Sequence, residues 1–154
     1  MTETLKAGRW FPVRLNVFRA FGFEGKGWQP AVWPIRGQED RNVWVAREGT
    51  YYFNKNDPIP LGENTLSDDG KGFKDRRDRR RPDAQGYGSN LKDTPNIENF
   101  LFLRAKRFEN DRKDSFKFVG VFIPDVNNCF DNVCVWKKVA TECTLPDGSW
   151  QAEE

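Results

Sequence analysis

Histidine is absent from this chain of 154 residues. Its absence removes histidine as a general acid or base, together with Ser–His and Cys–His nucleophile pairs and most catalytic zinc sites. The phosphate-binding pattern GxxxxGK[ST] does not occur, and Gly22, Gly25 and Gly27 do not form GxGxxG between a strand and a helix. The commonest catalytic and nucleotide-binding chemistries are therefore missing, and we expect a binding protein rather than an enzyme.

Cysteine is scarce as well. Cys129, Cys134 and Cys143 form an odd set near the end of the sequence, which fits free thiols in a reducing compartment better than a disulfide framework. A zinc site built on these three thiolates would need a fourth ligand, and a carboxylate such as Asp131 would be unusual in that role. We therefore expect free thiols, no bound metal and no other cofactor, with the zinc site as the less favoured alternative.

Long apolar runs are also missing. No stretch approaches the roughly 20 apolar residues of a membrane span, and residues 1–13 contain no apolar run of signal-peptide length. These absences predict a cytoplasmic protein without a membrane partner. The length suits one domain, residues 1–150, followed by a tail at 151–154. Thirteen Phe and six Trp against a single Met favour a core built from sheets rather than from a leucine-rich helix bundle.

Alternation of apolar and polar residues predicts six or seven strands. The segment 9–23 places Phe11, Val13, Leu15 and Val17 on one face, which predicts a strand. Further strands are expected at 31–36, 42–46, 50–54, 100–108, 115–123 and 132–140, with hairpins joining 42–46 to 50–54 and 100–108 to 115–123. One helical turn is expected near residues 94–98. The predicted fold is mainly β, an α+β fold with little helix, formed by a curled mixed or antiparallel sheet or by a small barrel.

Between residues 55 and 92 the apolar periodicity stops, which predicts a long polar loop within the domain. Within it, residues 70–82 form a basic run whose only acidic residues are Asp75 and Asp78. Because the net charge of the whole chain is only +2, this run concentrates positive charge in one segment. Guanidinium and ammonium groups bind phosphates, so the run predicts contact with a nucleic acid. The alternative is a solvated loop whose Arg–Asp pairs add little to stability. The candidate phosphate-binding residues are Lys71, Lys74, Arg76, Arg77, Arg79, Arg80 and Arg81.

Two aromatic residues lie among glycines, Trp28 in GKGW and Tyr87 in QGYGSN. Glycine lets the backbone approach a ligand closely, and aromatic rings stack on bases. We therefore predict Trp28 and Tyr87 as base-stacking residues, whereas most other aromatic residues are expected in or near the core.

Three segments resemble PUA-like domains of the SRA/YDG kind: QGYGSN at 85–90, FLFL at 100–103 and FKFVGVF at 116–122. The resemblance covers residues 63–123. It implies a PUA-like curved β-barrel that holds a modified or flipped base, with the segment before the hairpin forming part of the pocket and Tyr87 as a stacking residue.

The hypothesis that follows is a nucleic-acid-binding β-barrel module, with DNA favoured over RNA, that recognises a modified or flipped base. The main alternative is a protein-interaction or inhibitor module, of the kind used in defence or counter-defence, that binds a protein partner without nucleic acid. A third alternative is a carboxylate-based, metal-dependent nuclease starting at Pro82–Asp83, although no Glu-x-Lys follows on a strand.

Overall fold

The structure is a computed structural model that describes residues 3–24, 31–35, 37–54 and 56–145. Trp28 and the expected tail at 151–154 lie outside these residues. The chain forms two compact units. Unit 1 contains residues 1–46, 98–121 and 139–154, and unit 2 contains residues 47–97 and 122–138. The expected single domain stays a prediction.

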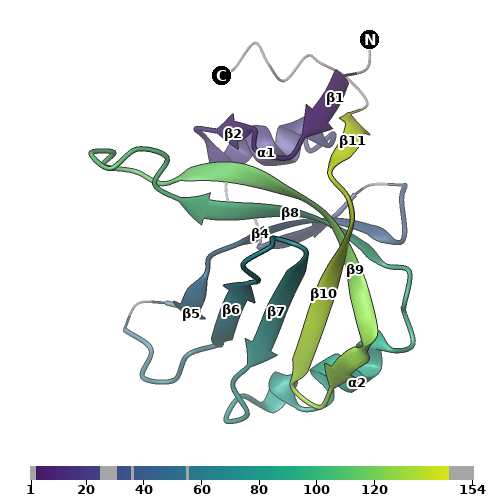
Figure 1. Cartoon of the computed structure of the whole chain (residues 1–154). Helices are drawn as coiled ribbons and strands as arrows, with labels where there is room; N and C mark the ends of the chain where they lie inside the picture. The colour runs from purple at the N-terminus through teal and green to yellow at the C-terminus, as the bar shows by residue number, and fades with distance from the viewer. Residues whose placement is uncertain (1–2, 25–30, 36, 55, 146–154) are drawn as a thin grey trace. The chain divides into compact units, whose positions relative to one another are not determined.

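The fold is mainly β with little helix, as predicted (Figure 1). Nine strands form one sheet in the order β3-β4-β8-β9-β10-β7-β6-β5, with β2 also paired to β9, and β1 and β11 form a second sheet. Within the described residues no pairing joins β3 to β5, so the sheet is open and the barrel alternative is not observed. The strands are β1 (Glu3–Lys6), β2 (Trp10–Phe11), β3 (Val32–Pro34), β4 (Arg41–Ala46), β5 (Gly49–Tyr51), β6 (Gly62–Leu66), β7 (Gly72–Arg77), β8 (Glu98–Ala105), β9 (Ser115–Phe130), β10 (Val133–Ala140) and β11 (Glu142–Leu145).

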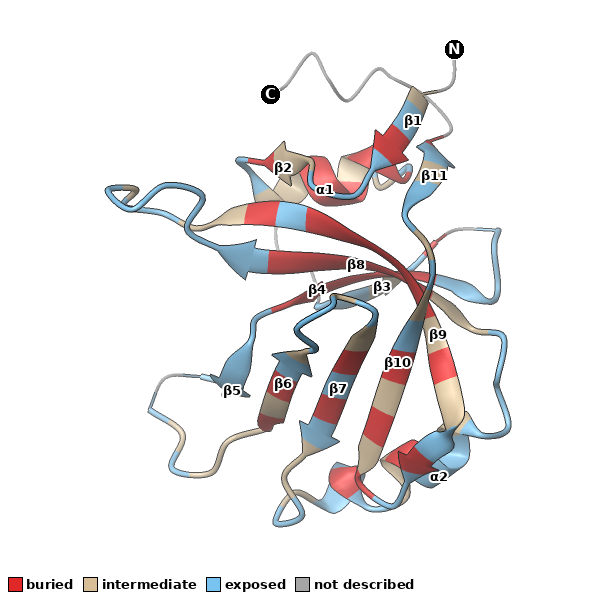
Figure 2. Cartoon of the chain, in the orientation of Figure 1, coloured by how far each residue is buried: buried red, intermediate tan, exposed pale blue. Residues whose placement is uncertain are grey.

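Unit 1 has a core of aromatic rings. Its central strand β8 is buried without interruption from Asn99 to Leu103, and Figure 2 shows this run in red. Such a run is typical of a strand covered on both faces, and β8 pairs in parallel with β4. Phe102 in β8 meets Phe11 edge-on at 5.6 Å between ring centroids, and Phe100 stacks on Phe21 at 5.2 Å.

The strand predicted at residues 9–23 is wrong beyond its first residues. Only Trp10–Phe11 form a strand, β2, and helix α1 (Arg14–Ala20) follows. Val17, Phe18 and Phe21 are all buried, and their i, i+1, i+4 spacing puts them on one helical face. Val13, expected on the buried face of the strand, is 47% exposed. The short alternating pattern is compatible with a strand and with a helix. The helix forms because it buries Val17, Phe18 and Phe21 on one face.

In unit 2 the single long loop predicted at residues 55–92 is wrong, because strands and helices interrupt it. It contains β6, β7, a 3-10 turn η1 (Pro82–Ala84) and helix α2 (Tyr87–Leu91). Strand β7 lies between β6 and β10 and pairs antiparallel with both. Its residues alternate between buried and exposed, seen as red and blue bands in Figure 2. The alternation was hidden in the sequence because the buried face carries Asp75 and the half-buried Arg77.

Four further expectations can be compared with the observed elements. The 100–108 and 115–123 hairpin is confirmed by neighbouring strands β8 and β9, and β10 matches the strand expected at 132–140. The hairpin expected between 42–46 and 50–54 is wrong, because β4 pairs with β3 and β8 whereas β5 pairs with β6. The helical turn expected near residues 94–98 is present as a single turn, in which the Ile97 N–H donates to the Thr94 carbonyl oxygen at 3.2 Å before β8 begins at Glu98. None of the helices in the described ranges is long and apolar enough to cross a membrane.

The prediction of three free thiols is wrong for two of them. Cys129 and Cys134 form a disulfide. They lie on β9 and β10 on either side of the tight turn at Asp131, a residue with φ of 50°, and the turn brings the two side chains together. Cys143 is free and half-buried, and burial raises the pKa of its thiol to about 11.

Candidate nucleic-acid interface

Strand β7 carries three of the seven basic residues predicted as phosphate-binding, Lys74, Arg76 and Arg77, and presents them on two faces. Successive strand residues point to opposite sides of a sheet, so Lys74 and Arg76 are exposed on one face. On the other face Phe73 and Asp75 are buried and Arg77 is half-buried. The basic residues of the run therefore do not form one continuous patch.

Beside Lys74 and Arg76, unit 2 has a groove of about 340 Å³. In the strand register, Thr65 of β6 and Val135 of β10 lie on either side of Lys74, so three neighbouring strands contribute to the groove. Arg76 forms an ion pair with Glu63 at its edge, with 3.4 Å between the two groups. The lining residues are Glu63, Thr65, Ser67, Gly72, Lys74, Arg76 and Val135.

On the opposite face of β7 a buried polar network surrounds Asp75, which is 2% exposed. Its carboxylate accepts hydrogen bonds from the Tyr51 hydroxyl at 3.1 Å and the Tyr87 hydroxyl at 2.6 Å. The Trp136 indole N–H in turn donates to the Tyr87 oxygen at 3.3 Å. The Arg77 guanidinium lies 3.9 Å from the centre of the Tyr87 ring. The network therefore connects β5, β7, β10 and α2.

Burial dominates the electrostatics of this network. It raises the pKa of Asp75 above its usual value, although the hydrogen bonds from Tyr87 and Tyr51 and the charge of Arg77 act in the opposite direction. Burial and the neighbouring Asp75 charge also raise the pKa values of Tyr51 and Tyr87. Both hydroxyls therefore keep their protons at neutral pH and serve as donors to the carboxylate.

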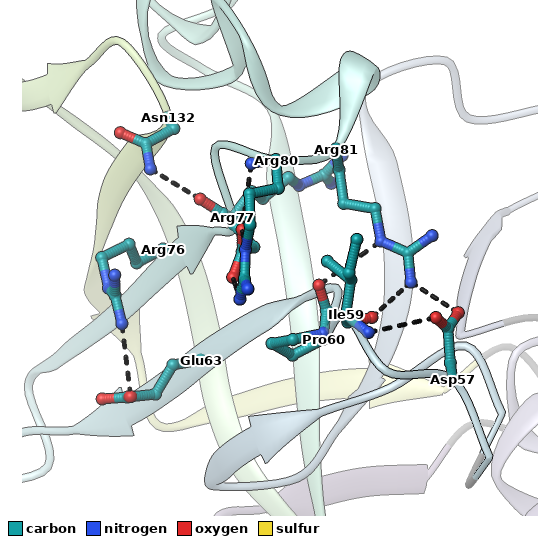
Figure 3. A network of polar contacts seen from close by, with 10 residues as sticks. Asp57, Ile59, Pro60, Glu63, Arg76, Arg77, Arg80, Arg81 and Asn132 are labelled. Atoms are coloured by element: carbon teal, nitrogen blue, oxygen red, sulfur yellow. Dashed lines mark hydrogen bonds and ion pairs between the residues drawn. The ribbon is translucent and has the colours of Figure 1, made fainter.

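The three arginines after β7 have three different environments, and Figure 3 shows two of them, Arg80 and Arg81. Arg79 is 73% exposed and pairs with Asp131 at 3.1 Å. Arg80 is 61% exposed and binds both oxygens of Asp78, which lowers the pKa of that carboxyl.

Arg81 is the least exposed of the three. Its guanidinium pairs with Asp57 at 2.5 Å and donates to the carbonyl oxygens of Ile59 and Pro60, and Figure 3 shows these contacts. The ion pair lowers the pKa of Asp57. Arg81 thus holds the segment before β6 in place, which is a structural role.

Helix α2 is attached to the turn between β9 and β10. The Gly88 N–H donates to the Asp131 carbonyl oxygen at 2.7 Å, and the Asp131 N–H donates to the Ser89 hydroxyl at 2.8 Å. A Cβ atom at Gly88 would lie 1.9 Å from the carbonyl oxygen of Val133, so only glycine permits this approach. From the same turn, the Asn132 side-chain amide donates to the Arg77 carbonyl oxygen at 2.6 Å. This contact joins the turn to the end of β7.

The predicted site residues are thus divided between several environments. Lys74 and Arg76 line the groove, Lys71 is exposed in the β6–β7 turn, and Arg79 and Arg80 are exposed after β7. Arg77 and Arg81 make internal contacts. The solvated-loop alternative describes Arg80 correctly, since its partner Asp78 lies two residues away. Tyr87 belongs to the buried network, and Trp28 lies outside the described residues.

Sequence reasoning missed the residues that organise this region. Asp75 was interpreted as a counter-charge in a loop, whereas it is the centre of the network with Tyr51 and Trp136. Thr65 of β6 and Ser67, which follows that strand, both line the groove and were also missed. The available signal was the alternation in GFKDRR, in which Phe73, Asp75 and Arg77 share one face of a strand.

Comparisons with known proteins agree on the fold. Residues 10–145 match the SRA family, the SET and RING associated domain, which extends the resemblance found at residues 63–123 over most of the chain. Among solved structures, "The 5-Hydroxymethylcytosine-Specific Restriction Enzyme AbaSI" is similar, with a TM-score of 0.67 and 18% sequence identity. The alignment covers 92% of this chain but 42% of that one, so this chain spans less than half of the enzyme's length. No curated protein matches.

Proposed function

This chain belongs to the SRA (SET and RING associated) domain family, and from that premise we propose that it is a DNA-binding module that recognises a modified cytosine. The family match over residues 10–145 is the observation that carries the proposal. The similar solved structure is named as an enzyme specific for 5-hydroxymethylcytosine, which supports the choice of cytosine modified at C5 as the ligand.

The charge distribution of unit 2 supports DNA as the partner. Arg79 and Arg80 are more than half exposed on the segment after β7, and Lys74 and Arg76 are exposed on β7 itself. Cationic side chains of this kind bind phosphates without reading sequence, and they position a protein on the duplex. We propose that these residues supply the sequence-independent part of the affinity and that base recognition adds to it.

We further propose that the chain acts by binding and not by cleavage. The enzyme activity in the name of the similar structure belongs to a protein more than twice as long as the aligned segment. This chain has no histidine for acid–base chemistry. Incubation of the protein with supercoiled modified plasmid and Mg²⁺ or Mn²⁺ tests this point directly, because a nick in the plasmid would contradict it.

The main experiment compares three duplexes of one sequence that differ only at a single cytosine, which is unmodified, 5-methylated or 5-hydroxymethylated. Binding is measured by fluorescence anisotropy at 50 and 200 mM salt. We expect binding to all three duplexes to weaken with salt, and one modified duplex to bind at least several-fold more tightly than the unmodified one at both concentrations.

Two outcomes would contradict the proposal in different ways. Equal affinity for the three duplexes would leave a DNA-binding protein without base recognition. No binding to DNA at low salt would favour the alternative of a protein-interaction or inhibitor module, whose affinity for its partner would depend little on salt.

The predicted stacking role of Tyr87 needs its own test, because its hydroxyl and one ring face already have partners. Tyr87→Phe keeps the ring and removes the hydrogen bond to Asp75, whereas Tyr87→Leu removes the ring. If the ring holds the base, Tyr87→Phe keeps the preference for the modified duplex and Tyr87→Leu loses it. If both variants lose the preference for the modified duplex equally, Tyr87 supports β7 through its hydrogen bond instead of stacking on the base. The same comparison applies to Trp28, as Trp28→Phe and Trp28→Leu.

A further inference from the structure

We propose that the groove formed by β6, β7 and β10 is a binding site for one phosphodiester group of a DNA strand. The proposal rests on the function proposed above and assigns part of that function to a defined place in unit 2. It also adds residues of β6 and β10 to a site that the sequence placed in a single basic segment.

The charge of the groove matches this ligand. Two cationic side chains, Lys74 and Arg76, and one anionic side chain, Glu63, line it, so the lining carries a net charge of +1. A phosphodiester carries a single negative charge, which balances that lining. Lys137 adds a third cation to this face, because it is exposed and lies opposite Gly72 in the register of β10 and β7.

The cations of the groove are available to a ligand. Within the ranges that the structure describes, the Lys74 ammonium group has no ion pair, and its side chain is exposed. Arg76 is 51% exposed and pairs with Glu63, itself 46% exposed. An ion pair this exposed contributes little to stability, so a phosphate can compete with Glu63 for the guanidinium.

The floor of the groove is low and well fixed. Gly72 has no side chain, and the nearest atoms to a Cβ built there are the Ser67 hydroxyl oxygen at 3.6 Å and Val135 Cγ1 at 4.0 Å. The Gly72 N–H donates to the Ser67 hydroxyl at 2.9 Å, and the Ser67 N–H donates to the Gly72 carbonyl oxygen at 2.8 Å. The turn is therefore held on both sides, and Gly72 adds no side chain to the groove.

The other face of β7 keeps the two cations in position. Phe73 and Asp75 alternate with Lys74 and Arg76 and are both buried, Asp75 within the hydrogen-bond network of Tyr51 and Tyr87. A strand fixed in this way holds its exposed side chains at a set spacing. Preorganised cations lose less conformational freedom when they bind a phosphate than cations on a mobile loop.

The test measures the salt dependence of binding to one unmodified duplex by fluorescence anisotropy between 50 and 200 mM salt. For Lys74→Gln, loss of one phosphate contact lowers the slope of log K against log salt by about 0.9. Over this fourfold range of salt, the variant then loses about 3.5-fold less affinity than the wild type does. Lys92→Gln is the matched control, because it removes the same charge from an exposed lysine of unit 2 that does not line the groove.

Two further variants test the groove without removing a cation. Gly72→Leu places a side chain over the floor, where even its Cβ makes only ordinary contacts, so the protein folds and binding weakens. Glu63→Gln removes the competitor of Arg76 and the negative charge of the groove, so binding tightens. Circular dichroism confirms the fold of each variant. If the groove binds the phosphate, Glu63→Gln raises the affinity for DNA and Lys74→Gln lowers it.

Failure of this proposal can be distinguished from failure of the proposed function. If the wild type binds DNA and prefers a modified duplex, but Lys74→Gln and Gly72→Leu behave like Lys92→Gln, the phosphate lies elsewhere and the groove is excluded. If the wild type binds no DNA at 50 mM salt, both proposals are wrong. If RNA of the same sequence shows the same salt slopes and the same variant effects, the groove binds phosphate but DNA is not its specific partner.

Discussion

Helix α2 approaches the β9–β10 turn at Gly88, where a Cβ atom would have less room than at the other described glycines of unit 2, and this approach gives the sharpest stability prediction. In Gly88→Ala the new methyl group would lie 1.9 Å from the Val133 carbonyl oxygen and 2.8 Å from the Phe130 amide nitrogen. Both contacts are with backbone atoms, so no side-chain rotation relieves them. The helix must move away from the turn.

The size of the effect follows from three contributions. Movement of α2 breaks the hydrogen bonds Gly88–Asp131 and Asp131–Ser89, at about 1 kcal/mol each. Overpacking adds about 1–3 kcal/mol. Alanine is favoured over glycine inside a helix by about 1 kcal/mol, which acts in the opposite direction. The net loss is about 2–4 kcal/mol, out of the roughly 5–15 kcal/mol that stabilise a typical domain.

Urea unfolding followed by tryptophan fluorescence measures this difference. Gly72→Ala is the control, because its Cβ would meet no atom closer than 3.6 Å and its free energy of unfolding should stay close to that of the wild type. Helix propensity alone predicts that Gly88→Ala is the more stable protein. A Gly88→Ala variant as stable as Gly72→Ala would therefore refute the packing of α2 described above.

Three other predictions concern groups with defined partners. Because burial raises the pKa of Asp75, the folded state binds a proton more strongly than the unfolded state does. The wild type therefore loses stability as the pH rises above about 4. Asp75→Asn removes this loss, which urea midpoints at several pH values measure. Arg81→Ala loses the bonds to two backbone carbonyls and about 2 kcal/mol, whereas Arg80→Ala leaves the urea midpoint unchanged. Reduction of the Cys129–Cys134 disulfide, which closes a short loop, lowers the free energy of unfolding by about 2 kcal/mol; a double Cys→Ala variant should not respond to the reductant.

The sequence predicted the mainly β class and most of the strands in unit 1 because these strands are apolar. The run Phe100–Leu103 and the segment Phe116–Phe122 bury hydrophobic side chains, and their pattern needs no tertiary information. Helix α1 was missed because seven residues are too few to distinguish the periodicity of a helix from that of a strand. Its identity depends on Phe21 packing against Phe100 and Phe102, which are distant in the sequence.

The candidate site was predicted only in part, for a different physical reason. A basic run was correctly identified, but hydropathy alone cannot show that Lys74 and Arg77 point in opposite directions, because every residue from 74 to 81 is charged. The burial of Asp75 depends on Tyr51, Tyr87 and Trp136, which belong to three other elements. Likewise, the role of Arg81 follows from Asp57, which lies 24 residues earlier in the chain. Such partners become visible only when the chain is folded.

The interleaving of the two units along the chain has a consequence for biosynthesis. Unit 2 contains residues 47–97 and 122–138, and unit 1 pairs β1 at Glu3–Lys6 with β11 at Glu142–Leu145. During translation β1 can therefore pair only after β11 has been synthesised, and β7 can pair with β10 only after β10 has been synthesised. Neither unit can close while the chain is still short, so folding is governed by contacts between distant segments and is expected to be slow. A nascent chain arrested before residue 130 should remain sensitive to protease throughout, including the basic strand that is protected on one face in the finished protein.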